Sequence, residues 1–140
     1  MDSFRLEPRI GGCAIWINDK ALRRWLEPKE RRVKATSPGD YLWLPPQVAL
    51  LPSRHLLGEP APSDGEWAEE WHEGWGTHKI AVGGCECGSV GCRPLLVTIE
   101  LDRGTVMWRD FISNDVKDYG LSFTFARGQY EHELREREAA

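Results

Sequence analysis

Three cysteines stand close together in the second half of the chain, in the run Cys-Glu-Cys-Gly-Ser-Val-Gly-Cys from Cys85 to Cys92. In an extended chain residues i and i+2 point the same way, so the thiols of Cys85 and Cys87 can converge on one point. Gly88 and Gly91 allow the backbone to curl and bring Cys92 back to that point. Three thiolates in this arrangement are typical of a tetrahedral zinc site, which needs one further ligand.

The fourth ligand of such a structural zinc site has to come from another part of the chain. His78, on the strand that enters the turn, is the first candidate, Cys13 is the alternative, and His72 is a third. Two other interpretations of the cysteines stay open. They can pack as small buried apolar side chains without any metal, or Cys85 and Cys87 can form an exchangeable disulfide that Cys92 resolves.

The nine residues from Cys85 to Arg93 resemble the post-SET zinc motif of histone lysine methyltransferases, Cys-x-Cys-Gly-x3-Cys-Arg. This resemblance implies that the three cysteines share a zinc ion with a fourth ligand from elsewhere in the chain. It does not extend to the catalytic activity, because the Asn-His-Ser motif and a Gly-Glu-Tyr-type segment are both missing.

A wider pattern runs from Tyr41 to the C-terminal part of the chain. It consists of Leu-Leu-Gly near residue 57, then Cys-x-Cys-Gly-x-x-Gly-Cys-x-Pro-Leu-Leu, then Val-x-Trp-x-x-Phe. The chain here resembles a family of small uncharacterised bacterial proteins. The resemblance implies a bacterial origin and this architecture, and it carries no activity.

A second cluster of interest is the acidic segment 59–77, which we expect to be a long loop or a short helix. Its tryptophans recur at four-residue spacing, which would place them on one side of a helix. Aromatic anchors among carboxylates suit a protein partner with a basic surface, and they can also receive a cation over the ring faces. The alternative is a loop whose tryptophans cover the hairpin of the cysteine motif. The predicted protein-binding residues are Trp67, Trp71, Trp75, Glu66, Glu69, Glu70 and Glu73.

Composition limits the possible protein classes. The chain has 140 residues, a formal net charge of −4 and seven tryptophans, and we expect it to form a single domain over residues 1–140. It shows neither a signal-peptide pattern nor an apolar run long enough to span a bilayer, so we expect a cytoplasmic protein with reduced thiols. Seven basic residues lie between Lys20 and Lys34, but the overall acidity and the lack of a nucleic-acid motif disfavour nucleic acid as the partner.

Catalytic motifs are also missing from the sequence. His72-Glu73 and His132-Glu133 are not followed by the second histidine of a zinc-protease motif, and neither a nucleophile elbow nor a phosphate-binding loop is present. We therefore favour a non-enzymatic protein-binding protein, most concretely a bacterial immunity protein that blocks a toxin. The alternatives are a thiol redox or metal-dependent enzyme that uses the cysteine cluster, and a zinc-stabilised nucleic-acid adaptor.

The strands and helices predicted around these residues indicate an α+β fold. We expect an antiparallel β-meander packed by helices. In the first half, residues 12–17 predict a strand. Asn18 or Asp19 is then expected to cap a helix that runs through Leu26 and is ended by Pro28. Between residues 41 and 57 the prolines favour one or two short helical turns.

The second half carries a clearer strand pattern. We expect a strand over 78–82, a turn made by the cysteine motif, and a return strand over 94–101 whose apolar residues alternate onto one face. Residues 102–104 predict a compact turn into a third strand over 105–111, with Val106 and Trp108 on one side. Another strand is expected over 119–125. A charged helix should follow from about Ala126, anchored by Tyr130 and Leu134.

Overall fold

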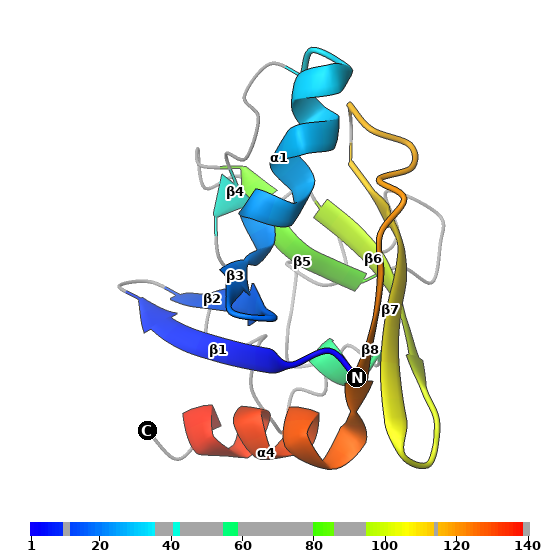
Figure 1. The fold of residues 1–140 in the computed structure, drawn as a ribbon. Helices are drawn as coiled ribbons and strands as arrows, with labels where there is room; N and C mark the ends of the chain where they lie inside the picture. Colours follow the sequence, from blue (N-terminus) through cyan, green and yellow to red (C-terminus); the bar gives the residue numbers. More distant parts are fainter. Residues whose placement is uncertain are drawn as a thin grey trace.

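The computed structural model describes residues 1–9, 12–35, 41–42, 55–58, 80–85, 95–113 and 115–138. It confirms the α+β class: the described residues form two antiparallel sheets, ordered β1-β2-β3 and β4-β5-β6-β7-β8, and two α-helices (Figure 1). In chain order the elements are β1 (Phe4–Arg9), β2 (Gly12–Ile17), β3 (Lys20–Ala21), α1 (Leu22–Arg32), β4 (Tyr41–Leu42), η1 (His55–Leu57), β5 (Ile80–Cys85), β6 (Leu95–Leu101), β7 (Thr105–Ile112), β8 (Ser122–Ala126) and α4 (Arg127–Glu138).

The smaller sheet is built on a hairpin of β1 and β2. The predicted strand over 12–17 is confirmed as β2, and β1 is an additional strand that is not predicted above. Phe4 of β1 lies opposite Ile17, and Leu6 lies opposite Ile15, so these buried residues share one face. Alternate residues of a strand point to opposite faces, which places Arg5 and Trp16 on the other side of the sheet.

The predicted start of the first helix is wrong. Asn18 and Asp19 adopt positive φ angles of 52° and 60° and form a two-residue turn between β2 and β3, as such short hairpin turns require. The side-chain Oδ1 of Asn18 accepts a hydrogen bond from the backbone N–H of Ser3 at 2.8 Å. Helix α1 therefore begins only at Leu22. Ala21 precedes it and supplies no side-chain capping hydrogen bond.

The predicted end of this helix at Pro28 is also wrong. Pro28 lies inside α1, which continues to Arg32, although proline removes one backbone donor from the helix interior. The helix is supported beyond Pro28 by the buried side chain of Glu30 and by an ion pair in which Arg31 Nε donates to Glu27 Oε1 at 2.9 Å. The basic residues of this region thus belong to the last turn of a helix, where positive charge is favourable.

The central strands of the larger sheet follow the prediction closely. The return strand and the third strand are confirmed as β6 and β7, which are antiparallel neighbours. Between them the backbone N–H of Asp102 donates to the carbonyl of Thr105 at 2.9 Å, which closes the predicted turn. The side chains of Val106 and Trp108 are completely buried on one face of β7, as expected.

The strand that precedes the cysteine motif is shifted from the predicted position. β5 runs from Ile80 to Cys85, whereas the prediction ended the strand at Val82 and gave Cys85 to the turn. The two-residue strand β4 explains the extension, because its Tyr41 pairs with Cys85 and its Leu42 pairs with Gly84. Residues 86–94, which join β5 to β6, lie outside the described residues. Of the helical turns expected between 41 and 57, the described part contains η1.

The last strand and the C-terminal helix agree with the prediction apart from the beginning of the strand. β8 starts at Ser122 rather than at Tyr119, whose side chain is buried outside the strand. The helix α4 begins at Arg127, and its apolar anchors Tyr130 and Leu134 are both buried.

One core joins both sheets and α4. The ring of Phe4, from the smaller sheet, lies 5.6 Å from that of Trp108 and 4.4 Å from that of Tyr130, centroid to centroid. The indole N–H of Trp108 donates to the Tyr130 hydroxyl at 3.1 Å, and that hydroxyl donates to the carbonyl of Leu56 in η1. Burial raises the pKa of Tyr130, and the hydrogen bond from Trp108 acts in the opposite direction.

Helix α4 also covers the outer edge of β1, along which it lies in Figure 1. The side-chain amide of Gln129 accepts from the backbone N–H of Phe4 at 3.2 Å and donates to the carbonyl of Phe4 at 2.7 Å. The carboxylate of Glu133 accepts from the N–H of Leu6 at 2.9 Å. Side chains of α4 thus form hydrogen bonds with backbone groups of this edge strand. Without them, the edge would be open to pairing with another chain.

Candidate functional site

Two of the predicted zinc ligands fall within the described residues, and they lie on different sheets. Cys85 is the last residue of β5 in the larger sheet. Cys13 lies in β2 of the smaller sheet, where its side chain is 4 % exposed and belongs to the core. The other candidates, Cys87, Cys92, His78 and His72, lie outside the described residues. Among the residues that the structure describes, no group of three or more potential ligands gathers around one point.

The predicted protein-binding residues lie outside the described part of the chain altogether. They are Trp67, Trp71, Trp75, Glu66, Glu69, Glu70 and Glu73. What the structure does place is the last described residue before this segment and the first described residue after it. Gly58 follows η1, and Ile80 begins β5.

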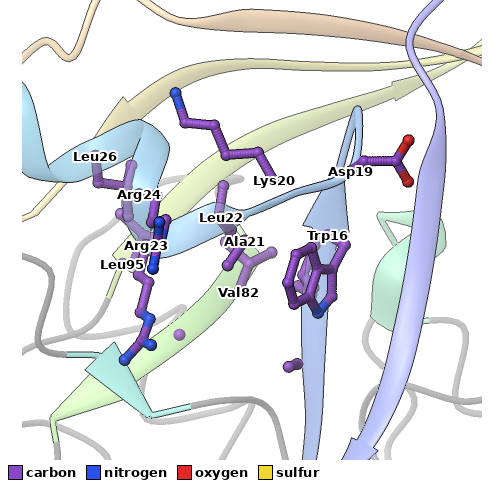
Figure 2. Close-up of a pocket in the computed structure, with 13 residues that line it drawn as sticks. Trp16, Asp19, Lys20, Ala21, Leu22, Arg23, Arg24, Leu26, Val82 and Leu95 are labelled. Atoms are coloured by element: carbon purple, nitrogen blue, oxygen red, sulfur yellow. The ribbon is translucent and has the colours of Figure 1, made fainter.

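A cavity of about 450 Å³ opens between the smaller sheet, the beginning of α1 and the strands β5 and β6 (Figure 2). This volume is within the range of small-molecule sites in proteins, about 300–1,000 Å³. The described residues that line it are Ala14, Ile15, Trp16, Asp19, Lys20, Ala21, Leu22, Arg23, Arg24, Leu26, Val82, Gly83 and Leu95. They come from separate parts of the chain, and the cavity is therefore a product of tertiary packing.

One wall of the cavity is apolar. Leu22 and Leu26 come from α1, Val82 from β5 and Leu95 from β6, and all four are buried parts of the core. Gly83 adds no side chain to this wall. Such a surface provides burial for an apolar group but offers it no hydrogen bonds.

Trp16 forms the opposite side of the cavity. The guanidinium of Arg5 lies 4.9 Å from the centroid of the indole ring, within the range of a cation–π contact. The Nε1 atom of Trp16 is buried and has no hydrogen-bond partner in the described structure. Buried polar atoms are nearly always hydrogen-bonded, so this donor is an exception that calls for an acceptor.

The mouth of the cavity is rich in positive charge. Lys20, Arg23 and Arg24 line it together with the single acid Asp19. The ammonium of Lys20 lies 4.1 Å from the ring centroid of Trp25, with which it makes a cation–π contact. The first turn of α1 contains no acidic residue, so its backbone N–H groups add to the positive potential of this region.

No family model, curated protein or solved structure matches this chain. The assignment of a site therefore rests on the geometry just described.

The sequence reasoning missed this cavity. The signal available in the sequence was the pair Arg23-Arg24 following the hairpin turn, which we assign above to a general basic run. Nothing in the sequence connects that pair with Trp16 or Val82, because their proximity arises from the packing of the two sheets. Among the described residues, no helix has the length and apolar character needed to cross a membrane.

Proposed function

We propose that the protein is a non-enzymatic, cytoplasmic binding protein that recognises a basic protein partner through the acidic, tryptophan-bearing segment 59–77. The most concrete form of this proposal is a bacterial immunity protein that blocks a toxin. Tryptophans supply anchors of large area, and the surrounding carboxylates steer a partner of opposite charge.

The observation that carries the proposal is the way in which the two ends of this segment are held. Gly58 has a positive φ of 83° and packs so tightly against β6 that a Cβ at this position would lie 3.3 Å from the carbonyl oxygen of Ile99. Three residues past the other end, Ile80 pairs with Val97 of the same strand. Both described residues that flank the segment thus lie against one strand of the larger sheet, and binding residues are often carried by segments that a sheet holds at both ends.

The experiment compares the tagged wild-type chain with a variant carrying Trp67→Ala, Trp71→Ala and Trp75→Ala. The partner is the product of the neighbouring gene, made separately and tested for toxicity when it is expressed alone. We expect the wild-type chain to bind it and relieve the toxicity, and the variant to lose both effects while its melting temperature stays within about 3 °C of the wild type.

Two results would contradict the proposal. If the triple variant unfolds, the tryptophans belong to the core. If it folds and protects as well as the wild type, the segment is not the interface. Replacing Glu66, Glu69, Glu70 and Glu73 by glutamine should also weaken binding, whereas a variant with Glu136→Gln and Glu138→Gln removes acidic charge elsewhere and should bind as the wild type does.

We also propose a structural zinc ion held by Cys85, Cys87, Cys92 and either His78 or Cys13. The spacing of the three cysteines supports it, and so does the position of Cys85 at the end of a central strand, from which a metal would tie the β5–β6 connection to the sheet.

A further inference from the structure

We propose that the cavity between Trp16 and the beginning of α1 binds a small organic anion, a carboxylate or sulfonate carried on an aromatic or branched apolar body. This inference does not depend on the proposed protein-binding segment 59–77. Its apolar body would lie against the leucine wall, and its acid group would face Arg23, Arg24 and the first turn of α1.

The apolar part of the proposed ligand is inferred from the side chains that line the cavity. Leu22, Leu26, Val82 and Leu95 are buried aliphatic side chains that border the cavity. The indole ring of Trp16 faces the cavity from the other side and offers a flat surface of the kind on which aromatic groups stack. A fully hydrated ion such as free phosphate would leave both surfaces unused, so the geometry favours a ligand with a substantial apolar part.

The negative charge of the proposed ligand is inferred from the charged residues that line the cavity. They are Asp19, Lys20, Arg23 and Arg24. In Figure 2 the carboxylate of Asp19 and the ammonium of Lys20 both point away from Leu22 and Val82. Within the described residues, neither Arg23 nor Arg24 forms an ion pair. Two guanidinium groups that pair with no carboxylate of the described residues favour an acidic ligand, since arginine binds planar oxyanions in a bidentate manner.

The start of α1 also supports an anion. The first-turn N–H groups of α1, an eleven-residue helix, receive no side-chain cap from Ala21. They can therefore donate to an acid group bound beside Arg23 and Arg24.

The test uses two fluorescent probes that share nearly the same apolar body. Anilinonaphthalene sulfonate carries an acid group, and N-phenylnaphthylamine does not. We expect the folded wild-type protein to bind the sulfonate with one site per chain and at least about tenfold more tightly than the neutral probe, a difference that added salt should reduce.

Variants then locate the site. Arg23→Gln and Arg24→Gln should each weaken sulfonate binding about fivefold to tenfold and leave the neutral probe unaffected. Trp16→Ala removes the ring that lines the cavity, and it should weaken both probes. Arg32→Gln is the matched control, because it removes the same charge from the other end of α1 and should change neither affinity.

Three outcomes would overturn the inference. The first is equal binding of the two probes. The second is an effect of Arg32→Gln as large as that of Arg23→Gln or Arg24→Gln. The third is sulfonate binding accompanied by loss of the near-ultraviolet circular dichroism of the protein, which would mean that the probe binds a loosened state. Retained circular dichroism in every variant ensures that a loss of binding reports on the site.

Discussion

The hydroxyl of Tyr119 donates a hydrogen bond to the carboxylate of Glu30 at 2.6 Å, although the two residues stand 89 positions apart in the sequence. The same hydroxyl lies 2.9 Å from Ser113 Oγ, and Glu30 is only 1 % exposed. Helix α1 is thereby tied to the connection between β7 and β8. A buried carboxylate is tolerated only where such hydrogen bonds replace its water.

The Glu30–Tyr119 contact should carry measurable stability. Tyr119→Phe removes one donor to a buried carboxylate and should lower the free energy of unfolding by about 1–3 kcal/mol. In the Glu30→Gln background the same change should cost less, because the amide is neutral. Urea unfolding of both single variants and the double variant gives the coupling energy, and strictly additive effects would show that the pair does not act as a unit.

Pro28 offers a prediction of the opposite sign. Since it interrupts the hydrogen bonding inside α1, Pro28→Ala should raise the free energy of unfolding by about 1–2 kcal/mol, less than the full penalty of an internal proline because proline also restricts the unfolded chain. Thermal and urea unfolding measure the change. A lower stability would mean that the pyrrolidine ring makes packing contacts that alanine cannot replace.

The sequence predicted the elements whose local signals agree with each other. The hairpin of β6 and β7 combines alternating apolar residues with a turn sequence, and both features point to the same structure. The Asn18-Asp19 pair suits a helix cap and a two-residue hairpin turn equally well, and only the pairing of β2 with β3 decides between them. Phe4 and Leu6 do alternate with charged residues, but two alternating apolar residues are too weak a pattern, and β1 becomes recognisable only through its partner β2.

The stability of the protein should fall at alkaline pH because of Tyr130. Its pKa is raised in the folded state by burial, so folding favours the protonated phenol. The stabilisation is complete below the unfolded value near pH 10 and is lost above it, at about 1.4 kcal/mol per pH unit for this single group. Urea unfolding between pH 9 and pH 11 measures the slope. Tyr130→Phe should have a shallower slope, and an unchanged slope would assign the effect to other groups.

The zinc proposal has a direct test. Protein purified without chelator should contain about one zinc per chain, and a chelator should lower its melting temperature. Cys92→Ser should abolish the metal content, and the effects of His78→Ala and Cys13→Ser should show which of the two supplies the fourth ligand. A content below about 0.2 zinc per chain, with every thiol titratable, would remove the metal in favour of packing or redox roles for the cysteines.

The cavity lies beyond what sequence patterns can predict, for a physical reason. Trp16, Arg23 and Val82 belong to three elements, and each occupies its position because of burial elsewhere in its element. A cysteine motif concentrates its ligands within a few residues and is visible in the sequence. A cavity formed where two sheets and a helix meet has no such local pattern.

The edge of β1 gives a further prediction. Gln129→Met keeps the length of the side chain but leaves the N–H and carbonyl of Phe4 without their partners on α4. We expect a loss of about 1–3 kcal/mol in unfolding free energy and an increased tendency to associate through the exposed strand edge. Sedimentation or size-exclusion chromatography at rising concentration measures the association. His132→Met, on the outer side of α4, serves as the control. It should leave both the unfolding free energy and the association of the protein unchanged.

The same contact sets an order of events during synthesis. Phe4 and Gln129, whose side chain hydrogen-bonds the backbone of Phe4, are 125 positions apart in the sequence. The edge of β1 therefore leaves the ribosome long before Gln129 is made. At elongation rates of about 5–20 residues per second, that edge stays uncovered for several seconds or more. During this interval neighbouring nascent chains on one messenger can pair with it. The edge of β1 is therefore covered against such pairing only after residues 127–138 have been synthesised.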